Sequence, residues 1–290
     1  MIEGKTCLVT GSTSGIGKEI AAGLAKMKAN VVLVGRNKAK CQATMEEIWR
    51  TASSIVTDKS RISYLLADLS SQASIRQLVS EFLDNYESLD VLINNAGVFL
   101  SRRFTTVDNI EYTFAVNHLA PFLLTNLLYE KMKASSPSRI ITTSSVAHRG
   151  ARINFDNLQF ERGRYNGLEA YRQSKLSNIL FTKELARRSR GSGVTSNCFH
   201  PGGVRTNLVQ NNPWYYRLIW TIINPFLVSP KKGADTAIYL ASSSKVAEIS
   251  GEYFVNRRPI HLSGLADDKD AADRLWKISE ELTGINKEND

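Results

Sequence analysis

Short apolar runs rich in β-branched residues alternate with stretches of helical periodicity, and this alternation limits the possible folds more than any other feature of the chain. The apolar runs predict strands at residues 6–10, 30–34, 62–67, 90–93, 139–143 and 194–199. Helical spacing predicts helices at 16–28, 38–50, 75–86 and about 169–190. Strands and helices that alternate in this way form βαβ units. We therefore expect an α/β fold with a doubly wound parallel sheet and helices on both faces.

The length and composition fit one domain. A chain of 290 residues that is 42% hydrophobic can bury a full core, and no repeat, low-complexity segment or linker divides it. Two stretches break the alternation, and both follow the carboxyl end of a predicted strand, where open α/β sheets bind ligands: 146–168 and 200–230. We predict a single domain over residues 1–290, with a lid at about 207–230 and a C-terminal helical extension at about 268–284.

Charge and cysteine content argue against several classes of protein. The net charge of +9 is not concentrated in basic runs with stacking aromatics, so we expect no nucleic-acid binding but some attraction for phosphorylated cofactors. Cys7, Cys41 and Cys198 form no CxxC pair, which predicts neither a disulfide framework nor a metal site. The chain enters its first strand at once and has no window of about 18 apolar residues. We expect no signal peptide, no transmembrane anchor and a cytoplasmic location.

A glycine-rich turn joins the first predicted strand to the first predicted helix, in the sequence TGSTSGIG at residues 10–17. Gly11 lets the chain turn sharply, Gly15 lets the backbone approach a pyrophosphate, and Gly17 permits close packing of helix on strand. The helix N-terminus adds free N–H groups and a partial positive charge. This position predicts a Rossmann-type dinucleotide site, and an ordinary glycine-rich turn is the alternative.

The residues after the second predicted strand indicate which dinucleotide is bound. An NAD-specific site places a carboxylate there, because the ribose 2′-hydroxyl donates hydrogen bonds to it. This chain has Gly35, Arg36, Asn37 and Lys38 instead, and the planar guanidinium of Arg36 suits the 2′-phosphate of NADP. We predict NADP(H) as the cofactor; the alternative is that Arg36 is an ordinary surface arginine.

Tyr171 and Lys175 stand four residues apart in a predicted helix and therefore share one face. An ammonium group beside a phenol favours the phenolate, so we expect Lys175 to lower the pKa of Tyr171 and make it an acid or base near neutrality. Taken alone, such a pair usually marks an exposed helix face. The sequence TTSS at 142–145 places hydroxyl groups at the same sheet edge, where one can hold a substrate oxygen that changes between carbonyl and alkoxide.

Asn117 lies in the helical pattern that follows NNAG at residues 94–97. Pro121, four residues later, has no N–H to donate to the Asn117 carbonyl. We predict that this carbonyl holds a water on a proton path toward Lys175. A tolerated helix kink is the alternative.

With these residues in place, the chain resembles the short-chain dehydrogenase/reductase superfamily over about residues 4–255. The ordered motifs are TGSTSGIG, Asp68 in ADLS, NNAG, Asn117, SS at 144–145, YRQSK at 171–175 and HPGGVRT at 200–206. Within the superfamily it is similar to the retinol dehydrogenase group that reduces all-trans-retinal with NADPH. That similarity comes from NHLAPFLLT, SSVAH, the 26-residue gap from Ser145 to Tyr171, SKLSNILFTKELA, HPGGVRT and RLWKISEELTG.

The resemblance implies roles for the matching residues. Catalysis would use Asn117, Ser145, Tyr171 and Lys175, with Ser145 in place of Ser144 because the family uses the second serine of the pair. The expected cofactor site comprises the phosphate loop, the cleft and the nicotinamide cover: Gly11, Ser12, Ser14, Gly15, Ile16, Gly17, Arg36, Asn37, Lys38, Asp68, Leu69, Asn95, Ala96, Gly97, Tyr171, Lys175, Pro201, Gly202, Val204 and Thr206. Asp68 and Leu69 would contact adenine, and Lys175 would also bond the nicotinamide ribose.

The chain departs from this group in two ways. Many retinol dehydrogenases carry a membrane anchor before the glycine loop, whereas ten residues precede Gly11 here. Gly203 and Gln173 stand where relatives often carry bulkier or different groups, which predicts an altered pocket.

Residues 207–229 are rich in aromatic and branched apolar side chains. Such a lid suits a lipophilic substrate, peripheral contact with a membrane, or packing against the protein itself or a neighbouring subunit. The leading hypothesis is an NADPH-dependent enzyme that interconverts a lipophilic alcohol and its aldehyde or ketone, such as retinal. The alternatives are a reductase of steroid-like or xenobiotic carbonyls and a non-catalytic NADP-binding scaffold or sensor. The resemblance also implies a homodimer through the helices at 107–133 and 169–190.

Overall fold

The strands of the computed structural model, which describes residues 2–53, 55, 58–204 and 227–285, form an eight-stranded sheet. Their order is β3-β2-β1-β4-β5-β6-β7-β8. The bounds are β1 (Thr6–Thr10), β2 (Asn30–Gly35), β3 (Ile62–Leu66), β4 (Val91–Asn94), β5 (Ser138–Thr143), β6 (Val194–His200), β7 (Tyr253–Val255) and β8 (Arg258–Ile260). All neighbouring strands pair in parallel except β7 and β8, which are antiparallel. The predicted doubly wound α/β fold is confirmed.

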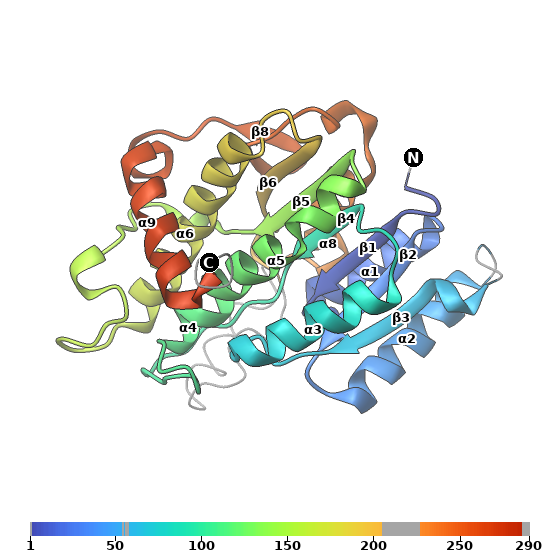
Figure 1. The fold of residues 1–290 in the computed structure, drawn as a ribbon, viewed down its shortest axis with the longest axis horizontal. Helices are drawn as coiled ribbons and strands as arrows, with labels where there is room; N and C mark the ends of the chain where they lie inside the picture. Colours follow the sequence, from blue (N-terminus) through green and yellow to red (C-terminus); the bar gives the residue numbers. More distant parts are fainter. Residues whose placement is uncertain (1, 54, 56–57, 205–226, 286–290) are drawn as a thin grey trace.

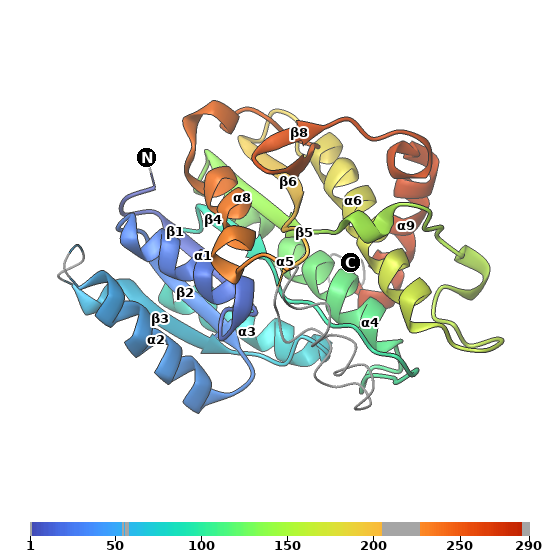
Figure 2. The same cartoon turned by 180° about the vertical axis from the view of Figure 1, so that it is seen from behind.

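Helices cover both faces of this sheet. Figure 1 shows α3 (Gln72–Asn85), α5 (Ala120–Ala134) and α6 (Gly167–Arg188) in front of the strands. Figure 2 shows the opposite face, which is covered by α1 (Gly15–Lys26), α2 (Lys38–Ala52) and α8 (Pro230–Ser242). After β3 the chain crosses to β4 on the other side of β1, so the strand order reverses between β1 and β4. The carboxyl ends of strands at such a reversal form a crevice that binds ligands.

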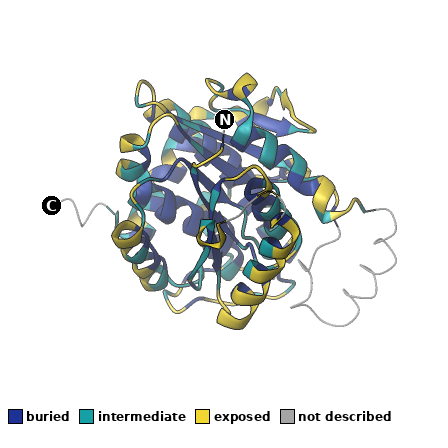
Figure 3. Ribbon diagram, turned by 90° about the vertical axis from the view of Figure 1, so that its right-hand side faces the viewer, coloured by how far each residue is buried: buried dark blue, intermediate teal, exposed yellow. Residues whose placement is uncertain are grey.

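The central strands are apolar on both faces, as buried parallel strands require. Leu8, Val32, Leu92 and Ile140 pack with α3, α5 and α6, and their exposed fractions are 1% or less. The residues that follow each of them along the strands pack with α1 and α8: Val9, Leu33, Ile93 and Ile141. Figure 3 shows these strands and the inner faces of the helices buried, with the exposed residues on the outside.

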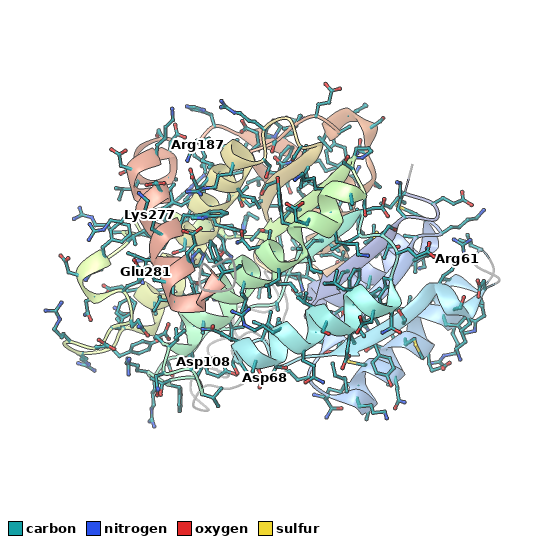
Figure 4. The ribbon with its side chains drawn as sticks, in the orientation of Figure 1. Arg61, Asp68, Asp108, Arg187, Lys277 and Glu281 are labelled. Atoms are coloured by element: carbon teal, nitrogen blue, oxygen red, sulfur yellow. The ribbon has the colours of Figure 1, made fainter. Side chains whose placement is uncertain are left out.

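A last helix, α9 (Lys269–Thr283), packs on the outside of α6 (Figure 1). The Trp276 ring contacts Phe122 of α5 at a centroid distance of 4.9 Å and stacks on Phe181 of α6 at 5.8 Å. The Arg188 guanidinium lies 4.4 Å from the Trp276 ring centroid. Figure 4 shows Lys277 and Glu281 on the outer side of α9. Helix α9 thus covers part of α5 and α6 with its apolar face and presents charged residues outward.

Between β4 and α5, the helix that carries Asn117 is irregular. One turn of α-helix, α4 (Tyr112–Phe114), leads into a π-helical turn at Ala115–Leu119, in which the Ala120 N–H bonds the Ala115 carbonyl. Asn117 lies at the centre of this turn, just before the proline of α5. The sequence predicts a helix here, but it does not predict the π-helical turn. The water on the Asn117 carbonyl stays a prediction.

Most of the lid expected at 207–230 falls on residues 205–226, which lie outside the described part of the chain. Within the described ranges, no helix has the length and apolar composition needed to cross a membrane.

Candidate active site

The glycine-rich turn lies at the crevice between β1 and β4. Gly11 and Gly15 have φ angles of 64° and 55°, in the left-handed region that favours glycine. A Cβ on Gly17 would lie 2.3 Å from the Gly11 carbonyl oxygen and 2.4 Å from Asn95 Nδ2. Ser14, exposed at the N-cap of α1, makes no capping bond with its side chain. The turn therefore requires its glycines and leaves the start of α1 accessible, as a phosphate cradle must.

The side chains of Ser12 and Asn95, both predicted at the cofactor, brace this turn. Ser12 is fully buried, and its hydroxyl accepts from Val34 N at 2.9 Å and donates to Val34 O at 3.3 Å. Asn95 Nδ2 donates to the Thr10 carbonyl at 2.9 Å. The Thr10 hydroxyl in turn accepts from the backbone N–H groups of Asn95 and Ala96. The sequence shows that both residues are polar, but it does not show that their side chains bond the backbone of the neighbouring strands β2 and β1.

A groove of about 470 Å³ lies beside β2 and β3. Arg36, Lys38 and Asp68 line it together with residues of β3 and α3. Figure 4 shows Asp68 at this sheet edge. The Asp68 carboxylate accepts from the Ser70 N–H and hydroxyl at 3.0 and 2.8 Å. Arg36 is exposed and donates to the Tyr112 hydroxyl at 3.3 Å. The groove thus combines two cations with a carboxylate that is already hydrogen-bonded.

Two predicted neighbours of this groove have other surroundings. Asn37 caps α2, because its side-chain oxygen accepts from Lys40 N at 2.9 Å. Leu69 lines a separate small pocket with residues of α3, the π-helical turn and α5. Asp68 and Leu69 therefore line different pockets, and their contact with adenine stays a prediction.

The four predicted catalytic residues lie together. Lys175 Nζ lies 5.5 Å from the centroid of the Tyr171 ring and donates to the Thr143 carbonyl at 3.2 Å. The Ser145 side chain lies beside the Tyr171 hydroxyl and acts to lower its pKa. Ser144 is buried, and its hydroxyl donates to the Lys175 carbonyl at 2.7 Å. Ser145 is therefore the serine that faces Tyr171, whereas Ser144 holds the helix of Lys175 against β5.

Asn117 reaches this cluster from the π-helical turn. Its side chain accepts from Val98 N at 2.7 Å and donates to Val98 O at 2.9 Å and to Ser174 Oγ at 3.0 Å. A Cβ on Gly97 would lie 3.4 Å from both Asn117 Oδ1 and Lys175 Nζ. Asn117 therefore ties the segment after β4 to α6 beside Lys175.

The expected lowering of the Tyr171 pKa is wrong for this structure. Burial raises the pKa of Tyr171 to about 12, against a smaller opposing effect of the hydrogen bond with Ser145. Burial also lowers the pKa of Lys175 to about 8. Spacing in a helix predicts that the two groups share a face, but it does not reveal how far their surroundings keep water away and so disfavour both charged forms.

Two further residues near Tyr171 were not predicted with these roles. The Phe99 ring packs edge-on against the Tyr171 ring at 5.8 Å. Gln173 is buried, accepts from Asn154 N at 3.0 Å and donates to Leu158 O at 2.9 Å. Gln173 thus braces the segment between β5 and α6. The sequence draws attention to Gln173 because it lies within YRQSK, but it does not show that the side chain points toward the segment between β5 and α6.

After β6, Pro201 and Gly202 lead to Val204, which is buried and pairs with Val228. A Cβ on Gly233 of α8 would lie 2.7 Å from Val204 and 3.3 Å from Ile16. This strand end therefore packs next to the start of α1. The predicted Thr206 lies outside the described residues. In the described ranges, no group of three or more His, Cys, Asp or Glu side chains could hold a metal ion.

Comparisons with known proteins agree with this arrangement. The family model for short chain dehydrogenases matches residues 5–214. Human retinol dehydrogenase 13 is 41% identical over 98% of this chain and 86% of its own length, and human retinol dehydrogenase 11 is 42% identical over 98% and 87%. Among solved structures, an uncharacterized protein from Mycobacterium paratuberculosis is similar with a TM-score of 0.78 and 31% identity over 98% of this chain and 94% of that one. A blue fluorescent protein from a metagenomic library, solved with NADPH, has a TM-score of 0.67 and 25% identity over 87% and 96%.

Proposed function

This chain belongs to the short-chain dehydrogenase family, and from that premise we propose that it reduces the carbonyl group of a lipophilic aldehyde or ketone with NADPH, using Tyr171 as the proton donor. The family and its retinol dehydrogenase relatives make it an oxidoreductase of alcohols and carbonyls. The observation that carries the proposal is the cluster in which the Ser145 side chain lies beside the Tyr171 hydroxyl and Lys175 Nζ lies 5.5 Å from the Tyr171 ring centroid.

The geometry supports distinct roles for these three side chains. NADPH, when bound, supplies the hydride to the carbonyl carbon. Tyr171, whose raised pKa keeps it protonated at neutral pH, donates a proton to the carbonyl oxygen. The Ser145 hydroxyl holds that oxygen as its charge develops. The ammonium of Lys175, buried beside the phenol, stabilises the phenolate that remains, because charges interact strongly away from water.

The sheet edge beside β2 supports NADP(H) as the cofactor. Arg36 and Lys38 line the groove that follows β2, where an NAD-specific site would place a carboxylate. The carboxylate that is present, Asp68, lies at the end of β3 and is hydrogen-bonded to Ser70. The NADPH in the similar metagenomic protein is further support.

A lipophilic substrate, with retinal as the first candidate, is supported by the relatives and by the lid sequence. Relatives named retinol dehydrogenases are about 40% identical over nearly the whole chain. The apolar and aromatic residues of 207–229 follow β6 in the sequence, next to Pro201 and Gly202. An apolar cover beside a few polar groups is the usual composition of a site for an apolar ligand.

Replacement of Tyr171 by phenylalanine tests the proposal. The variant keeps the ring that packs on Phe99 and removes only the hydroxyl, so turnover should fall at least about 100-fold while NADPH still binds. Oxidation of NADPH in the presence of retinal, medium-chain aldehydes or cyclic ketones measures turnover, and quenching of protein fluorescence measures binding. Tyr129→Phe is the matched control, because that hydroxyl bonds Ser192 away from this cluster. Unchanged turnover of Tyr171→Phe would refute the assigned role.

A further inference from the structure

Two imidazole rings hold the single peptide group that follows Ser145. His148 Nδ1 lies 2.6 Å from the Ser145 carbonyl oxygen. His200 Nδ1 accepts from the Val146 N–H at 3.4 Å. The Ser145 carbonyl and the Val146 N–H belong to the same planar peptide unit, so the two rings bond its two ends.

The two rings must be in opposite tautomers. A carbonyl oxygen only accepts, so Nδ1 of His148 carries the proton. An N–H only donates, so Nδ1 of His200 carries the lone pair and its proton is on Nε2. Burial lowers the pKa of His148, and burial together with His148 and Arg149 lowers the pKa of His200 to about 4. Both rings are thus neutral at pH 7, as this pairing requires.

The rest of the sheet holds both histidines in place. His200 is the last residue of β6 and pairs with Val255 of β7. The His148 ring packs edge-on against Tyr253 of β7 at 5.0 Å. Val146, by contrast, is 41% exposed, so its side chain does little to fix the turn. The turn that carries Ser145 is therefore held from β6 and β7 through the imidazole rings.

We infer that His148 and His200 are positioning residues that fix the peptide after Ser145 and thereby aim the Ser145 hydroxyl at Tyr171. This inference rests on the proposed function, in which Ser145 holds the substrate oxygen. A rotation of this peptide would turn the serine away from the phenol. Displacements of about 1 Å at a catalytic group are enough to slow an enzyme severely.

Two amides of different length test this inference. Asparagine places its amide where imidazole Nδ1 lies, as a donor for His148→Asn and an acceptor for His200→Asn. Glutamine places the same amide near the position of Nε2. We expect kcat to fall about tenfold in His148→Gln and in His200→Gln, to stay within about twofold of wild type in the asparagine variants, and KM for NADPH to be unchanged in all four. If the rings only supported folding, the asparagine and glutamine variants would have the same kcat.

The double glutamine variant tests whether the rings act on one group. Residues that share one partner have non-additive effects, so kcat should fall by less than the product of the two single losses. A loss equal to that product, or equal kcat in the asparagine and glutamine variants, would overturn the inference. His261→Gln is the control, because His261 is exposed on the segment after β8.

A measurement without turnover separates this inference from the proposed function. Nitrogen-15 NMR of the imidazole rings, assigned with the asparagine variants, should show His148 protonated at Nδ1 and His200 protonated at Nε2. The same tautomer in both rings would refute the pairing even in an active enzyme. If NADPH is not oxidised with any carbonyl compound while the tautomers are as expected, the proposed function fails and the pairing of the rings stands.

Discussion

Replacement of Lys175 by methionine is expected to abolish turnover and to stabilise the fold at neutral pH. Lys175 is 3% exposed, and burial lowers its pKa from 10.5 to about 8. A tenfold change in a protonation equilibrium is worth about 1.4 kcal/mol, so the buried ammonium lowers the free energy of unfolding by about 3 kcal/mol. Methionine fills similar space without a charge to desolvate.

The sign of this effect can be followed with pH. Below about pH 8 the lysine is protonated in both the folded and the unfolded chain, so the whole penalty is present. From about pH 8 to 10.5 the unfolded chain binds more protons, so the wild type gains stability as pH rises. We expect Lys175→Met to be about 2–3 kcal/mol more stable than wild type at pH 7 and within about 1 kcal/mol of it at pH 10. The lost hydrogen bond changes this little, because the Thr143 carbonyl also accepts from Asn178 at 3.1 Å.

Urea unfolding at both pH values measures the two free energies. Lys40→Met, at an exposed position of α2, controls for the substitution itself. A stability difference between Lys175→Met and wild type that is the same at pH 7 and pH 10 would refute the reasoning, as would a variant less stable than wild type at pH 7. Either result would mean that the ammonium carries no desolvation penalty in the folded chain.

Three further expectations concern the cofactor, the phenol and the outer helix. Arg36→Asp should reverse the preference for NADPH over NADH, because a carboxylate repels a 2′-phosphate; unchanged relative affinities in binding titrations would exclude Arg36 as the selector. Because burial raises the pKa of Tyr171 to about 12, alcohol oxidation should accelerate about tenfold per pH unit from about pH 6 to 8, below the pKa of Lys175, while carbonyl reduction changes little. Parallel pH profiles test this, and equal slopes would contradict it. Trp276→Ala should lower the free energy of unfolding in urea by about 3–5 kcal/mol, since the ring is 5% exposed; a loss below about 1 kcal/mol would contradict its place in the core.

The strands were predicted well because buried parallel strands are continuous apolar runs. Each end of the six predicted strands lies within one residue of the corresponding end in the structure. The strands β7 and β8 have three residues each, too few for a periodic pattern, and β8 contains Pro259, which is tolerated at the edge of a sheet. Helix α8 was not predicted either, although its Ser229 N-cap and Pro230 are typical helix-start signals.

The sequence predicts which residues form the candidate site better than it predicts their hydrogen bonds and burial. Spacing brings Tyr171 and Lys175 to one face, and the resemblance points to Ser145 over Ser144, which agrees with the geometry. The sequence does not show that the side chains of Ser12 and Asn95 bond the backbone of β2 and β1. It also does not give the depth of burial, which sets the direction of the Tyr171 pKa.

The packing of α9 determines what else can approach α5 and α6. With Trp276 seated against Phe122 and Phe181, a second copy of the chain cannot dock on that part of the two helices unless α9 first moves aside. The homodimer remains a prediction, and a dimer built on these helices must either avoid that part or exchange α9 between copies.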